Sequence, residues 1–157
     1  MHPSKLLPLA TFAMLAFAPC ASAAGNGALD RAFNKADINE NGFLDSVEFM
    51  ALQSRRTKWT DATYRFQFAD ADDDGLLSPV EFRASNGGKD GGKPSITETF
   101  ALADLDDNSS LDPAEYSLTQ AQTLPSRKLL RNFDRKDRND DALLGPAEFG
   151  PAIGVPF

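Results

Sequence analysis

A twelve-residue acidic segment occurs four times at regular spacing, and this repeat constrains the fold more than any other feature of the sequence. The segments begin at residues 37, 70, 104 and 137, so the period is 33 or 34 residues. The second copy, residues 70–81, reads DADDDGLLSPVE, with aspartates at alternate positions, then a glycine, and a glutamate at the end. Regular repetition of this length predicts four copies of one supersecondary unit.

The spacing of the carboxylates distinguishes these segments from ordinary acidic loops. Carboxylates this close repel one another, and most acidic runs are simply solvated loops. Here Asp70, Asp72, Asp74, Gly75 and Glu81 match the pattern D-x-[DN]-x-[DN]-G-x5-E of a loop that coordinates calcium. Calcium takes six to eight oxygen ligands, and alternate residues of a curling loop can direct their oxygens inward. The glycine permits the sharp turn.

Apolar residues repeat in register with the acidic ones, which a solvated loop would not require. An aromatic residue stands four positions before each segment: Phe33, Phe66, Phe100 and Phe133. Another follows each final glutamate: Phe49, Phe82, Tyr116 and Phe149. The eighth position is always leucine: Leu44, Leu77, Leu111 and Leu144. Over roughly residues 28 to 150 the sequence therefore resembles the EF-hand family, as four hands in a calmodulin-like series in an exported protein of bacterial type.

The resemblance implies a set of calcium ligands in each loop. In loop one they are Asp37, Asn39, Asn41, Phe43, Asp45 and Glu48, and in loop two Asp70, Asp72, Asp74, Leu76, Ser78 and Glu81. In loop three they are Asp104, Asp106, Asn108, Ser110, Asp112 and Glu115, and in loop four Asp137, Asn139, Asp141, Leu143 and Glu148. The seventh residue offers its backbone carbonyl, the ninth acts through a water, and the final glutamate binds with both oxygens. Loops three and four depart from the pattern, because Ser109 and Ala142 replace the glycine. If the family geometry holds, both residues lie at positive φ and are strained by about 1–2 kcal/mol each.

Local signals predict a helix on each side of every loop. Leu29, Ala32, Phe33 and Ala36 have the spacing of a one-sided helix that enters loop one. Ser95 and Glu98 form a capping box before loop three. A proline at the tenth loop position begins three of the exiting helices: Pro79, Pro113 and Pro146. The predicted fold is all-α, with four helix–loop–helix units paired into two lobes. The family pairing implies short two-residue β-bridges, Leu44 to Leu77 and Leu111 to Leu144.

The expected domains follow from these units. Residues 1–23 are a signal peptide, 24–86 the N-terminal pair of hands and 95–150 the C-terminal pair. The glycines of residues 87–94 should break any continuous helix and form a flexible linker. Residues 151–157 form an apolar tail, which either covers the groove of its own lobe or frays.

The N-terminus predicts export to the periplasm or the medium. Lys5 precedes an apolar stretch too short to span a membrane comfortably, and Ala21-Ser22-Ala23 is a cleavage site of the A-x-A type. The alternative is lipid attachment at Cys20, where Pro19 fits poorly. Cleavage removes the only histidine and the only cysteine. The mature chain then has no side chain for catalysis by a thiol or a Ser–His pair, and none for zinc ligation by imidazole or thiol. No enzymatic activity is therefore expected.

Charge and composition narrow the function further. The sequence has 23 acidic and 16 basic residues, and 18 of the acidic ones lie in the four loops. We expect binding of up to four calcium ions, with magnesium as the competing cation. Such a chain should repel nucleic acid and, after signal cleavage, anionic membranes, and we expect a monomer. Met50 is the only methionine beyond the signal, whereas promiscuous calcium-sensor grooves are rich in methionine. This favours a calcium buffer or calcium-stabilised protein. The alternative is a calcium-dependent interaction module for one dedicated protein partner.

Overall fold

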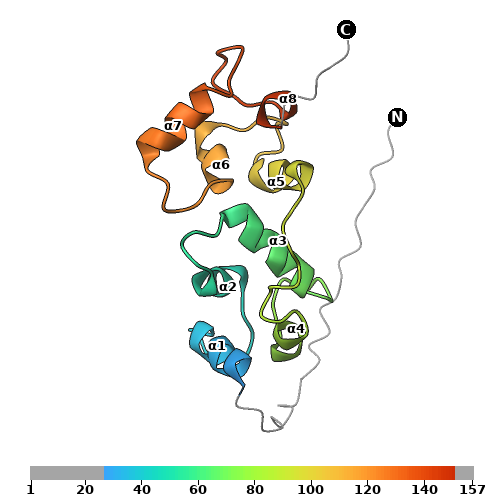
Figure 1. The fold of residues 1–157 in the computed structure, drawn as a ribbon. Helices are drawn as coiled ribbons and strands as arrows, with labels where there is room; N and C mark the ends of the chain where they lie inside the picture. Colours follow the sequence, from blue (N-terminus) through green and yellow to red (C-terminus); the bar gives the residue numbers. More distant parts are fainter. Residues whose placement is uncertain (1–26, 151–157) are drawn as a thin grey trace, which may run out of the picture.

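The computed structural model describes residues 27–150, which contain eight α-helices and no strands longer than an isolated bridge (Figure 1). They are α1 (Ala28–Ala36), α2 (Ser46–Leu52), α3 (Trp59–Ala69), α4 (Pro79–Ala84), α5 (Ile96–Ala103), α6 (Pro113–Leu118), α7 (Ser126–Asp134) and α8 (Pro146–Phe149). Consecutive helices flank the four acidic loops in turn, so the predicted all-α fold of helix–loop–helix units is confirmed. None of the described helices is long and apolar enough to cross a membrane. The predicted signal peptide and the apolar tail lie outside the described residues.

Two short antiparallel bridges join the loops in pairs, as the sequence predicts. The N–H of Leu44 donates to the carbonyl of Leu77 at 2.9 Å, and the reverse bond is 2.8 Å long. Leu111 and Leu144 exchange the same two bonds, each 2.9 Å long. All four leucines are fully buried. The eighth loop position therefore holds two loops together and anchors both to the core.

Six of the eight aromatic residues that flank the loops are buried in the two cores. In the N-terminal pair, the ring centroids of Phe33 and Phe82 are 5.5 Å apart, and those of Phe49 and Phe66 are 5.6 Å apart. In the C-terminal pair, Tyr116 contacts Phe133 in the same edge-to-face manner. Such pairs contribute beyond the burial of their area. The aromatic repeat in the sequence is thus the repeat of the core.

Most exiting helices begin inside their loop with a side-chain cap. Asp45, Ser78 and Asp112 each accept a hydrogen bond from the N–H three residues later. The glutamate at that position in turn accepts a bond from the N–H of the capping residue. The predicted capping box of Ser95 and Glu98 has the same form at the start of α5. Capping satisfies N–H groups that a helix start otherwise leaves without partners.

The two pairs of hands are in contact, which differs from the expectation of lobes on a flexible joint. Helix α3 packs against α5, and a further bridge joins Lys58 to Ala121. The glycine-rich segment follows a series of turns along the N-terminal pair. The guanidinium Nε of Arg65 donates to the carbonyl of Gly92 at 3.1 Å. Gly88 is buried beneath the ring of Phe49. From the sequence, these glycines were expected to break a helix. Gly88 has a further role, because the absence of a side chain lets its backbone approach the ring of Phe49 closely.

We expect Gly88→Ala to destabilise the fold by about 2–4 kcal/mol, because it combines backbone strain with over-packing. The backbone φ of Gly88 is +75°, and an added Cβ would lie 2.3 Å from the ring of Phe49. Gly92→Ala is the matched control, since Gly92 has φ +71° with nothing within 4 Å of a new Cβ. Urea unfolding measures the free energy of unfolding of both variants, and the difference between their losses reports the contact with Phe49. Equal losses of stability would show that this contact contributes nothing.

Candidate metal centres

Carboxylate oxygens converge in two of the loops closely enough to share one metal ion. In loop two, Asp70, Asp72 and Asp74 each direct one oxygen so that the three lie within 4.8 Å of one another. In loop three, Asp104, Asp106 and Glu115 do the same. In loop three the oxygens come from the beginning and the end of the twelve-residue segment, so this loop must be curled. Clusters of hard oxygen donors of this kind suit calcium.

The first aspartate of each loop holds the turn in place. One of its oxygens, Oδ2, accepts a hydrogen bond from the N–H of the sixth residue at 2.9 Å in all four loops; the donors are Gly42, Gly75, Ser109 and Ala142. The side chain of the fifth residue accepts a bond of 2.8 or 2.9 Å from the N–H of the seventh. The loops are therefore folded around their own acidic side chains.

The final glutamate ties the end of each loop back to its beginning. Its Oε1 accepts a bond of 2.9 or 3.0 Å from the N–H of the second residue; the donors are Ile38, Ala71, Leu105 and Arg138. Its Oε2 accepts from the N–H of the ninth residue, at 2.9 to 3.1 Å; the donors are Asp45, Ser78, Asp112 and Gly145. Both oxygens of the glutamate are thus fixed at the loop, as a two-oxygen contact with calcium requires.

The ninth position has a second role, as the N-cap of the exiting helix, which the sequence predicts for Ser78. Asp45, Ser78 and Asp112 were predicted to act through a water, but in the structure their side chains cap the exiting helices. Ser78 Oγ also donates to Glu81 Oε2 at 2.7 Å. The spacing of three residues between the ninth and twelfth positions is that of a capping box, and it indicates the same role for Asp45 and Asp112. Metal ligation by the predicted residues as a whole stays a prediction.

The backbone is left-handed at the sixth position of every loop. The φ angles are +84° for Gly42 and +82° for Gly75, and +65° for Ser109 and +63° for Ala142. The strain that was predicted for the two residues that are not glycine is therefore present. The fourth position of every loop is also left-handed, which was not predicted from the sequence. Its φ lies between +55° and +58°, and its residues are Glu40, Asp73, Asp107 and Asp140. Three of these are aspartates, which tolerate this conformation better than most residues do.

Electrostatics within loop two show the competition between repulsion and hydrogen bonding. Desolvation, followed by the negative charges of Asp74 and Glu81, raises the pKa of Asp72 above its usual value. Burial of Glu81 also opposes its ionisation, but the N–H and hydroxyl of Ser78 and the N–H of Ala71 outweigh it and lower the pKa of Glu81. In loop four, the N–H groups of Arg138 and Gly145 lower the pKa of Glu148. Glu81 and Glu148 are thus held ionised, and an added cation would relieve the repulsion at Asp72.

Loop four contains an acidic oxygen with no partner among the described residues. In the other loops Oδ1 of the first aspartate accepts a bond from the N–H of the fifth residue. Asp137 Oδ1 is buried and accepts none. A buried oxygen without a partner is unfavourable, and a bound cation would satisfy it. This oxygen fits a metal ion in loop four, although three converging carboxylates are found only in loops two and three among the described residues.

Comparison with known families agrees with this geometry. Residues 29–53 and 63–84 each match the family model of the EF hand. These two segments contain the whole of loops one and two, so the first two hands match the EF-hand family of calcium-binding proteins. No curated protein matches the sequence. Loops three and four lie outside the matched segments, but they repeat most of the hydrogen bonds of the first two; loop four lacks the bond to Oδ1 of its first aspartate.

We expect Ala142→Gly to tighten calcium binding in the C-terminal pair by about tenfold. Relief of a left-handed non-glycine residue is worth about 1–2 kcal/mol, and 1.4 kcal/mol is a factor of ten in affinity. Ser109→Gly should help less, because loop three already offers four acidic ligands, whereas loop four has three, Gly145 at the ninth position and Arg138 within the loop. Calcium titration of both variants against the wild type measures the difference. Unchanged or weaker binding by Ala142→Gly would contradict the assignment of strain to this residue.

Proposed function

We propose that this protein is an exported calcium-binding protein that buffers calcium or is stabilised by it, with up to four ions bound. The observation that carries the proposal is the convergence of three aspartate oxygens in loop two. The closing glutamate, Glu81, is fixed by hydrogen bonds at the same loop. The signal-like N-terminal sequence supports export.

The donor set favours calcium over other metals. The predicted ligands are carboxylates, amides, hydroxyls and backbone carbonyls, without nitrogen or sulfur donors, and hard cations prefer such oxygens. Calcium accepts the larger and less regular shells that a twelve-residue loop provides, whereas magnesium demands a compact octahedron and gives up its water reluctantly. Magnesium is therefore proposed as a weaker competitor.

Packing around the N-terminal core supports a buffering or stabilising role over an interaction module. Gly88 lies on the ring of Phe49, and Gly87 lies close to Leu29 and Phe82. The chain's own glycine-rich segment thus occupies apolar surface that a target-binding groove would need to leave open. No catalytic role is proposed, because the clustered carboxylates already serve the loops.

Calorimetric titration of the chain from residue 24 onward, after removal of metals, tests the proposal. We expect two to four calcium ions per chain, with weaker or no heat from magnesium. No saturable binding at millimolar calcium would refute the function. An apolar dye provides the second measurement. Similar fluorescence with and without calcium is expected of a buffer, whereas a large calcium-dependent increase would favour the interaction module.

A further inference from the structure

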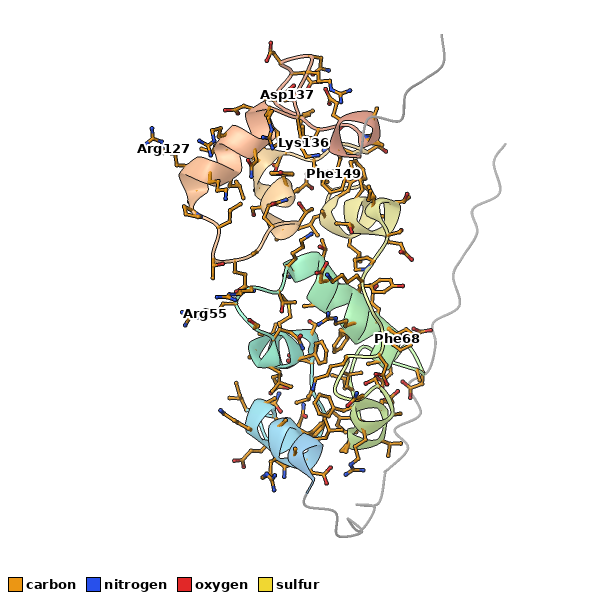
Figure 2. All side chains as sticks on the ribbon, in the orientation of Figure 1. Arg55, Phe68, Arg127, Lys136, Asp137 and Phe149 are labelled. Atoms are coloured by element: carbon orange, nitrogen blue, oxygen red, sulfur yellow. The ribbon has the colours of Figure 1, made fainter. Side chains whose placement is uncertain are left out.

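Lys136 occupies a position that the other three hands give to a small buried residue. It comes directly before the first aspartate of loop four, where the other loops have Ala36, Ala69 and Ala103. Those alanines are buried in the two cores. Figure 2 shows Lys136 close to Asp137 and Phe149, where α7 and α8 meet around loop four. Lysine replaces alanine only in the fourth hand, and this hand also has the shortest exiting helix, α8.

Helix α8 is too short to be well fixed by its own hydrogen bonds. It has four residues, whereas the other exiting helices, α2, α4 and α6, have six or seven. Its N-cap residue is Gly145, which has no side chain to cap the helix. Such a short segment does not hold a helical conformation alone. Nevertheless α8 carries Glu148, whose two oxygens must both reach loop four.

Lys136 supplies a contact at the far end of this helix. Its Nζ donates to the carbonyl oxygen of Phe149 at 2.7 Å and lies 5.5 Å from the centroid of the Phe149 ring. A cation is favourable at the C-terminal carbonyls of a helix and over an aromatic face. The same ring contacts Phe100 and Tyr116 in the core, with centroids 5.6 and 6.4 Å away. Lys136 therefore connects the start of loop four to the residue that follows Glu148.

We propose that Lys136 is a positioning residue for calcium in loop four: it fixes α8 through Phe149, so that Glu148 is held ready to bind the ion. This inference rests on the proposed calcium-binding function. It assigns to one side chain the task that a longer exiting helix performs in the other hands. Lys136 itself does not contact the ion.

The sign of the effect distinguishes this role from that of a nearby charge. Lys136 directly precedes Asp137 in the chain, and a fixed positive charge near a cation site weakens binding by repulsion. If Lys136 acted only as a charge, its removal would tighten calcium binding. If it positions Glu148, its removal loosens α8 and weakens binding. The two roles predict opposite changes in affinity.

The test compares Lys136→Met with Arg138→Met in the chain from residue 24 onward. Both variants remove one positive charge near loop four, but the Arg138 side chain is exposed, and only its backbone N–H contacts Glu148. Calcium is titrated while the backbone amide signals of residues 138 and 142 are followed by NMR. We expect about fivefold to tenfold weaker binding in loop four for Lys136→Met, as for the loss of one charge-assisted hydrogen bond. We expect equal or tighter binding for Arg138→Met.

Lys136→Arg keeps a donor and a cation, so it should restore most of the affinity. Loop-two signals serve as the folding control, because the N-terminal core does not include α8. Unchanged or tighter loop-four binding by Lys136→Met, with normal binding by the wild type, would overturn the positioning role alone. If calcium does not change the NMR signals of loop four in the wild type, the proposed function fails at this loop and the inference fails with it. Loss of loop-two binding in Lys136→Met would also count against a local role.

Discussion

Calcium should raise the thermal midpoint of the chain from residue 24 by at least about 10 °C over the chelated protein. A ligand that binds only the folded state stabilises it by about 2.7 kcal/mol per site at one hundred times its dissociation constant. Two such sites give about 5 kcal/mol, and each kcal/mol moves the midpoint of a domain of this size by roughly 2–8 °C. Melts followed by far-ultraviolet circular dichroism in calcium and in chelator measure the shift.

The control separates specific binding from general screening of an acidic protein. Sodium chloride at matched ionic strength weakens repulsion between exposed carboxylates without filling the loops. It should therefore reproduce only a small part of the shift. Equal midpoints in calcium, in salt and in chelator would show that the loops hold no ion in the folded chain.

The stabilisation should also depend on pH. The pKa of Asp72 is raised in the folded chain, mainly by desolvation and by the charges of Asp74 and Glu81. Its ionisation therefore opposes folding of the calcium-free chain, and this loss is relieved as the pH falls through the raised pKa. Calcium must displace the proton to bind, so its stabilising effect should shrink over the same acidic range. A calcium-dependent shift that stays constant into this range would contradict the involvement of Asp72.

Local features of the sites could be predicted from the sequence because they depend on short spacing. The alternate aspartates and the strained backbone at Ser109 and Ala142 lie within the twelve-residue units. The bridges between Leu44 and Leu77 and between Leu111 and Leu144 join two units, and they were expected from the family resemblance. A residue's place in such a unit determines its backbone conformation and the direction of its side chain. Because the loop occurs four times, each position can be compared across four copies, which a single loop would not allow.

The features that the sequence did not predict depend on contacts between units. The packing of Gly88 on Phe49 brings together the glycine-rich segment and the first hand, and nothing local to the glycine indicates an aromatic ring above it. The contact of Lys136 with Phe149 spans loop four. It could be suspected only by comparing Lys136 with the alanines at the same register. The contact between α3 and α5 had no sequence signal, because a glycine-rich segment predicts separation as readily as a close turn.

The closing glutamate of loop two gives the largest expected change in calcium affinity at a single site. Glu81 Oε1 accepts from the N–H of Ala71 at 3.0 Å. Its Oε2 accepts from the N–H of Ser78 at 2.9 Å and from the hydroxyl at 2.7 Å. Glutamine has the same shape, but it offers only one acceptor oxygen and carries no charge. The NH₂ group of the glutamine would therefore lie against the backbone N–H of Ala71 or Ser78, where two donors meet without an acceptor. Only one oxygen could reach the ion.

We therefore expect Glu81→Gln to weaken calcium binding in loop two by at least about a hundredfold, which corresponds to about 2.7 kcal/mol. Loop one should weaken to a smaller extent, because the bridge between Leu44 and Leu77 couples the two loops. Glu98→Gln is the matched control: Glu98 accepts from the N–H of Ser95 at the start of α5, in a capping box that belongs to no loop. It makes the same chemical change at a helix start while leaving every predicted calcium ligand intact. Residue-resolved calcium titrations of both variants should show loss of binding only for Glu81→Gln. If that variant keeps wild-type stoichiometry and affinity, Glu81 does not close the loop around the ion and the register of the second hand is wrong.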